Sequence, residues 1–204
     1  MVEPLTKDYA EKLAQELDVY DDLKDKIYDL ARKVIKNSKL CIYAVRRSNM
    51  EEAEKRLKEM EEMRTEMFKI AKDNPRLSTI NMIFNADQEY VEAAAIYYFM
   101  KEGRFPTKEE LETTVQEYIA GIMDAAGELL RIATDKMIAG DVEFAKKVRN
   151  VIEEIYLFML HVNPRDYELR RKIDYVTNIL NKLQEFIFYK EVMGPVKRIT
   201  GSEE

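Results

Sequence analysis

The sequence has few of the residues that form turns and end helices. Its 204 residues include only six glycines and five prolines. Sandwiches, barrels and doubly wound sheets need a turn signal about every ten residues, so this composition excludes most of them. Charged residues make up 35% of the chain, which is typical of helices with one solvated face. The composition therefore favours an all-α protein.

Cysteine and histidine are also scarce, because the chain has one of each, Cys41 and His161. A single cysteine excludes an intrachain disulfide and a cysteine-based zinc site, and it is consistent with a reducing compartment. A single histidine excludes any site that needs two. We expect Cys41 to be a small core residue and His161 to be structural.

No apolar run reaches the 18 residues that a membrane-spanning helix needs. The N-terminal residues lack the basic and apolar regions of a signal peptide. We therefore expect a soluble, cytoplasmic protein with no membrane partner. The net charge of −6 gives no overall attraction to nucleic acid, so any such binding would need a local basic patch.

Helical periodicity runs through nearly the whole chain. It predicts one all-α domain of about seven long helices over residues 1–194, with a flexible tail over residues 195–204. Helices of this length favour an elongated bundle that buries its remaining apolar edges in an oligomer. A first helix is expected from Thr6 to Leu17, and a break near Asp18 separates it from a longer helix that ends before Ser48-Asn49.

Capping residues, glycine and proline set the boundaries of the other helices. Asn49 and Asp141 are expected N-caps, Thr107 and Glu110 an expected capping box, and Gly140 an expected stop. The expected helices are Met50 to Asp73, Ser78 or Thr79 to Lys101, Thr107 to Ala139, Asp141 to Asn163, and Pro164 or Arg165 to Glu191, before Gly194-Pro195.

Two pairs of acidic residues are spaced so that each pair shares one helix face. They are Glu89 with Glu92, and Asp124 with Glu128. The face of the first pair continues into apolar residues, where a plain solvated face would continue with charged ones. The helix of the second pair contains two glycines. Each costs about 1 kcal/mol relative to alanine, which indicates that something approaches this backbone closely.

Four carboxylates from two neighbouring helices would form an oxygen-only site, which suits Mg²⁺ or Mn²⁺ better than zinc. Such an ion can polarise a phosphoryl oxygen and activate a water molecule. With 39 acidic residues in the chain, pairs at these spacings also arise by chance. A solvated or arginine-paired acidic face therefore remains the alternative interpretation.

Basic residues recur at steps of three and four on one predicted helix, opposite its apolar stripe. Such a cationic face could neutralise RNA phosphates, although an ordinary solvated helix face would have the same pattern. Arg131, one turn beyond Glu128, could contact phosphate or neutralise the acids. The candidate RNA-binding residues are Arg32, Lys36, Lys39, Arg46, Arg47 and Arg131, with Tyr43 among the first five.

The motifs around these acids resemble the translin family, and in particular its catalytic branch, translin-associated factor X. The resemblance lies in Gln88–Ala93, which reads QEYVEA, and in Glu117–Arg131, which ends in GELLR. The basic helix, Gly140-Asp141 and Leu169–Tyr175 also fall where that family has them. The similarity covers about Asp21 to Gly194. The sequence departs from the family pattern in two ways: Glu117 replaces the usual aspartate, and the proline that is common after the Gly-Asp element is absent, since Val142–Ala145 follow Asp141.

The resemblance implies an all-α fold, an octameric barrel around a cavity, and Mg²⁺-dependent endonucleolytic cleavage of RNA. It also implies that the four acids named above, Glu89, Glu92, Asp124 and Glu128, are the metal ligands and the catalytic residues. We therefore expect a homo-oligomeric endoribonuclease that binds RNA largely without regard to sequence. Single-stranded DNA is a further candidate partner.

Other functions stay open at this point. The chain could be a non-catalytic RNA- or DNA-binding scaffold, as translin itself is, with its acids serving as salt-bridge partners. A dimetal nucleotide pyrophosphatase also uses Glu-x-x-Glu spacings on bundled helices, but it leaves the GELLR match without a role. A ferritin-like di-iron protein is disfavoured because its Glu-x-x-His motifs are missing.

Overall fold

A computed structural model describes residues 5–193 of the chain. All regular structure in this range is helical, with six α-helices, one short 3-10 helix and no strand, which confirms the all-α prediction. The helices are α1 (Lys7–Arg46), α2 (Met50–Lys72), η1 (Leu77–Thr79), α3 (Asn81–Glu102), α4 (Val115–Ile138), α5 (Val142–Val162) and α6 (Tyr167–Met193).

The chain divides into two compact units, residues 1–117 and 118–204. The division falls within the first turn of α4, so most of this helix belongs to the second unit. The single domain predicted over residues 1–194 stays a prediction. The tail predicted over residues 195–204 and the Gly194-Pro195 stop lie outside the described residues.

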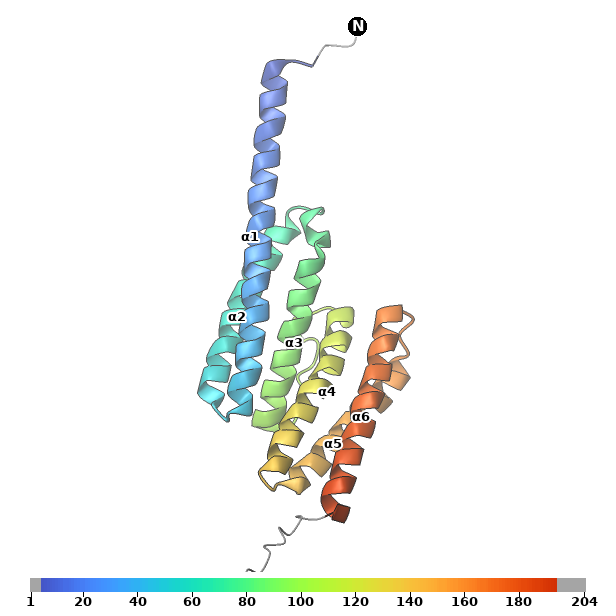
Figure 1. The fold of residues 1–204 in the computed structure, drawn as a ribbon. Helices are drawn as coiled ribbons and strands as arrows, with labels where there is room; N and C mark the ends of the chain where they lie inside the picture. The colour runs from blue at the N-terminus through green and yellow to red at the C-terminus, as the bar shows by residue number, and fades with distance from the viewer. Residues whose placement is uncertain (1–4, 194–204) are drawn as a thin grey trace, which may run out of the picture. The chain divides into compact units, whose positions relative to one another are not determined.

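In the first unit, α1 packs along α2 and α3, and its N-terminal end extends beyond both (Figure 1). The packed part of α1 buries Ile27, Ala31 and Val34 completely. They meet a core of methionine, isoleucine and alanine side chains from α2 and α3. The apolar stripe of the extending end, which includes Leu13 and Leu17, is exposed.

The break predicted near Asp18 is wrong, because α1 is one continuous helix of 40 residues. No glycine or proline interrupts this stretch, and aspartate is only mildly unfavourable inside a helix. The Thr6 hydroxyl accepts a hydrogen bond from the Tyr9 N–H and caps the start of the helix. Residues 5–193 therefore contain six α-helices where the sequence predicts about seven.

The predicted N-caps Asn49 and Asp141 are confirmed, and the predicted helix start at Ser78 or Thr79 is wrong. Asn49 accepts a hydrogen bond from the Glu52 N–H at 3.2 Å, and Asp141 accepts one from the Phe144 N–H at 2.9 Å. Ser78 and Thr79 instead lie in η1, where their hydroxyls donate back to preceding carbonyl groups. Both residues lie within η1, and the N-cap position of α3 is Ile80, which has no side-chain acceptor, so α3 begins without a side-chain cap.

The predicted capping box forms, but it does not start a helix. The Thr107 N–H donates to the Glu110 carboxylate at 2.7 Å, and the Glu110 N–H donates to the Thr107 hydroxyl at 3.2 Å. The chain then turns at Glu112, whose φ of 48° is left-handed, and α4 begins only at Val115. Contacts with buried side chains of α2 and α3, described below, favour this turn over a continued helix.

In the second unit, α5 and α6 pack against each other through residues such as Val148, Ile152 and Leu183, none of which is exposed. Gly140 has a φ of 99° after the end of α4, where the sequence predicts a stop. Asn163 ends α5 in the left-handed conformation. None of the helices in the described part of the chain combines the length and the apolar run that crossing a bilayer requires.

Candidate functional site

The first acidic pair, Glu89 and Glu92, lies on α3 in the first unit, and both side chains are half-buried. Ser38 of α1 is fully buried and donates its hydroxyl to Glu89 Oε2 at 2.6 Å. A hydrogen bond to an ionised carboxylate is stronger than one between neutral groups. Ser38 therefore fixes one oxygen of Glu89. This acidic face is not an ordinary solvated one, because Ile96 and Phe99 on the following turns are buried.

The second acidic pair, Asp124 and Glu128, lies on α4 in the second unit. Their side chains are only 22% and 13% exposed. Each carboxylate has a cationic partner: Lys172 of α6 forms an ion pair with Asp124, and Arg131 donates to Glu128 at 2.7 Å. The arginine-paired alternative considered from the sequence therefore applies to Glu128.

The close approach to the α4 backbone that the glycines predict is confirmed at Gly127. A Cβ atom at this position would lie 2.6 Å from the hydroxyl oxygen of Tyr175 on α6. That distance is too short for a carbon–oxygen contact, so a side chain at residue 127 would displace the tyrosine. The absence of a side chain at Gly127 thus lets Tyr175 lie against α4, three residues along the helix from Asp124.

The donor chemistry of the four acids fits a hard divalent cation. All their ligand atoms would be carboxylate oxygens, which Mg²⁺ and Mn²⁺ prefer, and they lie in partly buried positions where charge is poorly solvated. Among the described residues, however, no group of three or more histidine, cysteine, aspartate or glutamate side chains is placed to hold a metal ion. Each unit by itself presents two of the four acids, so the metal site stays a prediction.

The basic residues predicted on α1 form a solvent-facing stripe. Arg32, Lys36, Lys39 and Arg47 are exposed, and Arg46 is half-buried. The opposite face of the helix is core, since Val34, Cys41 and Val45 are at most 2% exposed. The Arg47 guanidinium lies 4.4 Å from the centre of the Tyr43 ring. The remaining candidate, Arg131, is 65% exposed although it is paired with Glu128.

A buried ion pair in the first unit was not predicted. Arg64 of α2 donates from Nε to Asp87 of α3 at 2.6 Å, and both side chains are under 10% exposed. The Arg64 guanidinium also lies 3.9 Å from the centre of the Tyr90 ring. Burial raises the pKa of the Tyr90 hydroxyl, which donates to Glu61 at 3.1 Å. This network lies one residue away from Glu89 along α3 and holds that segment in place.

The same network anchors the segment before α4. Arg64 donates to the Glu112 carbonyl at 3.4 Å, and the Thr113 hydroxyl donates to Asp87 at 2.5 Å. These contacts account for the left-handed turn at Glu112. A helix continued from Thr107 would move the Glu112 carbonyl and the Thr113 hydroxyl away from their buried partners. The network therefore supports α3 and ties the loop to it.

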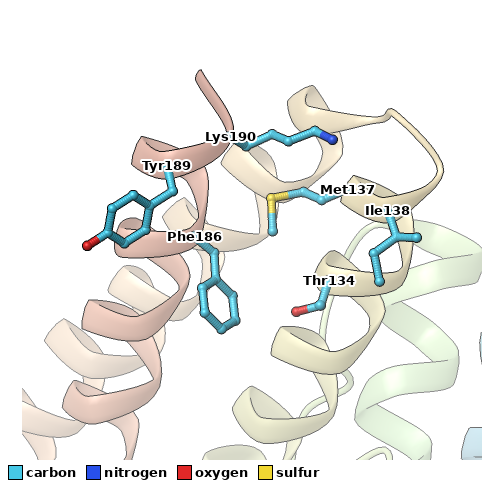
Figure 2. A pocket seen from close by; sticks show the side chains of 6 residues that line it. All are labelled: Thr134, Met137, Ile138, Phe186, Tyr189 and Lys190. Atoms are coloured by element: carbon cyan, nitrogen blue, oxygen red, sulfur yellow. The ribbon is translucent and has the colours of Figure 1, made fainter. Parts of the chain in front are cut away.

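The second unit has an open cavity of about 390 Å³ that is separate from the acids. Figure 2 shows its lining, which is mainly apolar and comes from the C-terminal turns of α4 and α6. It contains none of the predicted site residues. The lining residues are Thr134, Met137, Ile138, Phe186, Tyr189 and Lys190.

Cys41 and His161 have the surroundings expected of structural residues. The Cys41 thiol is buried and donates to the Ala53 carbonyl at 3.4 Å, and burial raises its pKa to about 12. A thiol with so high a pKa is a poor nucleophile. The His161 ring is exposed, and its Nδ1 is hydrogen-bonded to the Leu157 carbonyl oxygen, one turn earlier, at 2.7 Å.

Fold and side chains together define an all-helical protein with two pairs of partly buried carboxylates and one cationic helix face. The translin family model matches residues 22–194. This chain belongs to the translin family.

Known proteins of similar sequence and structure agree with that assignment. Translin-associated protein X of Pongo abelii is 24% identical over 88% of this chain and 76% of its own length. The crystal structure of apo-NeC3PO is 37% identical, covers 92% of this chain and 100% of its own, and has a TM-score of 0.86. The structure of an AfC3PO–duplex RNA complex is 25% identical, covers 91% of this chain and 97% of its own, and has a TM-score of 0.80.

Sequence reasoning missed the residues that hold the acids in place. Ser38 interrupts the apolar stripe of α1 between Val34 and Cys41, and a polar residue at an inward position could have indicated a buried partner. Lys172 lies in the Leu169–Tyr175 stretch that resembles the family. Nothing in that stretch marked Lys172 as the partner of Asp124, because the two residues are 48 positions apart.

Proposed function

We propose that this protein is a Mg²⁺-dependent endoribonuclease that works as a homo-oligomeric barrel, with eight subunits as the expected number. The observation that carries the proposal is the partly buried state of its acids in a translin-family chain. Glu89, Glu92, Asp124 and Glu128 stand where the family's catalytic branch has its metal ligands. A purely solvated acidic face would not have a buried serine fixing one of its carboxylates.

Similarity to the AfC3PO–duplex RNA complex supports RNA as the substrate. The basic stripe of α1 supports the same conclusion, because phosphate neutralisation by lysine and arginine supplies most of the affinity of such complexes. The stripe offers point charges and one aromatic ring. It therefore suits contacts to the RNA backbone that carry little sequence information.

In this proposal the four acids hold the metal. When bound, Mg²⁺ supplies Lewis-acid stabilisation of the phosphate and lowers the pKa of an attacking water. The chain's own residues do the rest. Ser38 fixes one oxygen of Glu89, Arg131 offsets part of the negative charge of Glu128, and the α1 stripe orients the phosphate backbone.

The test is RNA cleavage with Mg²⁺ and with EDTA, using the wild type, Glu89→Gln and Asp124→Asn. We expect EDTA to abolish cleavage and each substitution to lower its rate by roughly a hundredfold or more, as loss of a key stabilising group does. Glu62→Gln, at an exposed glutamate of α2, is the matched control and should cleave like the wild type. Cleavage without metal, or normal cleavage by Glu89→Gln, would refute the proposal.

A non-catalytic RNA-binding scaffold is the second candidate, and the ion pairs of Asp124 and Glu128 favour it. In a scaffold these pairs would be permanent, and the acids would stabilise the fold without binding metal. Retention of RNA on a filter with no cleavage in Mg²⁺ or Mn²⁺ would support this function over the first.

Mass measurement in solution, with and without RNA, tests the expected octamer.

A further inference from the structure

α6 contacts the acidic segment of α4 at two points that have the same spacing along both helices. Lys172 pairs with Asp124, and three residues further along each helix Tyr175 lies against Gly127. Residues three apart share one helix face. One face of α6 therefore contacts the stretch of α4 that carries Asp124 at these two points, and the missing Cβ of Gly127 allows the approach.

The Lys172–Asp124 pair lies in partly buried surroundings, with the two side chains 26% and 22% exposed. An ion pair so placed is screened less by water than a fully exposed pair. The ammonium group occupies an oxygen of the carboxylate and neutralises its charge. A divalent cation at the same carboxylate would compete for that oxygen and would repel the ammonium.

We propose that Lys172 is a resident counter-ion of the metal site. It holds the Asp124 carboxylate while no metal is bound, and it must move aside when a divalent cation binds. This inference rests on the proposed function, because it takes Asp124 as a metal ligand. It adds a positioning residue that lowers metal affinity and keeps the acidic segment neutral before metal arrives.

The role predicts an effect opposite to that of a structural ion pair. Removing a structural partner would disorder Asp124 and weaken metal binding. Removing a competing cation leaves the carboxylate free for the metal and strengthens binding. The ion pair contributes modestly in such a partly buried position, which still contacts solvent, so we expect a gain of about fivefold in affinity for the metal.

The experiment measures Mn²⁺ affinity of the full chain by calorimetry at low salt, with no RNA present. The variants are Lys172→Met and Lys172→Gln, and we expect both to bind Mn²⁺ about fivefold more tightly than the wild type. Lys182→Met removes an exposed lysine of the same helix and should bind like the wild type. Using two replacements keeps the test valid if one variant does not fold.

A second pair of measurements locates the effect. Asp124→Asn should bind Mn²⁺ more weakly than the wild type, and adding Lys172→Met to it should give no gain, because the lysine then has no carboxylate to block. In the single variant, the advantage over the wild type should shrink as salt rises and screens the pair.

Three outcomes would overturn the inference. Unchanged or weaker Mn²⁺ binding by folded Lys172→Met and Lys172→Gln, with normal binding by the wild type, would make Lys172 a structural residue. A gain that persists in the Asp124→Asn background would place its effect elsewhere. If the wild type binds no Mn²⁺ at all, the proposed function fails and this inference fails with it.

Discussion

Ser38 of α1 and Glu89 of α3 are joined by a hydrogen bond of 2.6 Å from the serine hydroxyl to the carboxylate. Ser38 has no exposed surface, so the serine end of the bond lies in the core of the first unit. It also crosses between two helices, and it sets where one oxygen of Glu89 lies. A ligand carboxylate that is fixed in this way loses less freedom when it binds a metal.

Replacing Ser38 by alanine should weaken the proposed site more than it weakens the fold. We expect Mn²⁺ affinity and RNA cleavage to fall roughly tenfold, as they do when a supporting hydrogen bond to a metal ligand is lost. The loss in free energy of unfolding should be about 1 kcal/mol. Calorimetry, cleavage assays and urea unfolding measure the three quantities.

Ser78→Ala is the control for that variant, because the Ser78 hydroxyl is exposed and bonds only within its own turn. It should leave metal binding and cleavage unchanged. Normal Mn²⁺ affinity in Ser38→Ala would show that the hydrogen bond does not support the metal site.

The buried Arg64–Asp87 pair should contribute strongly to stability. Asp87→Asn removes the carboxylate that receives both Arg64 and Thr113, and it leaves a buried guanidinium without its counter-charge. Breaking a buried pair in this way costs about 3 kcal/mol or more. Urea unfolding should show this loss, whereas Glu11→Gln, in an exposed pair with Lys7, should change stability by less than about 1 kcal/mol. A small loss in Asp87→Asn would contradict this account.

The helical class and most helix ends follow from local chemistry, which the sequence displays directly. The sequence predicts correctly the caps at Asn49 and Asp141 and the stop at Gly140. A cap or a left-handed turn depends only on a few neighbouring residues. The predicted start of α4 is wrong because the buried Arg64, 48 residues before Glu112, bonds to the Glu112 carbonyl and competes with the local capping box. The acid pairs could be predicted from their spacing, whereas Ser38 and Lys172 could not, since their partners are distant in sequence.

Gly127→Ala tests the contact between α4 and Tyr175. Alanine normally favours a helix by about 1 kcal/mol over glycine, but here its Cβ would lie 2.6 Å from the tyrosine hydroxyl. We expect the variant to be less stable than the wild type, despite the better helix propensity. Combining it with Tyr175→Phe removes the clashing oxygen, and thermal unfolding should then show partial recovery. No loss in the single variant would mean that α6 shifts freely.

The loop before α4 should respond to acid through Glu110. The hydrogen bond from Arg104, with help from the Thr107 N–H, lowers the pKa of Glu110 to about 2 from its ordinary value of 4.5. A carboxyl group with a lowered pKa stabilises the folded state above pH 4.5 and loses that effect as pH falls towards 2. The wild type should therefore exceed Glu110→Gln in stability at neutral pH, and the difference should vanish between pH 4.5 and 2.

Thermal unfolding at several pH values measures that difference. Glu62→Gln, at an exposed glutamate of α2, should show a much smaller difference from the wild type over the same range. A stability gap between the wild type and Glu110→Gln that stays constant down to pH 2 would mean that the Arg104 contact does not hold Glu110 ionised.

The basic stripe of α1 should contribute to the salt dependence of RNA binding. Lys36 and Lys39 are exposed on this stripe, and each phosphate contact contributes about 0.9 to the slope of log affinity against log salt for a duplex, and about 0.7 for a single strand. The double variant Lys36→Gln/Lys39→Gln should lower the slope by about 1.4 to 1.8 and weaken binding to all RNA sequences alike. The matched control is Lys7→Gln/Lys12→Gln, which makes the same charge change on the extending end of the same helix. Equal losses in the two double variants would show that RNA responds to net charge and does not contact the stripe.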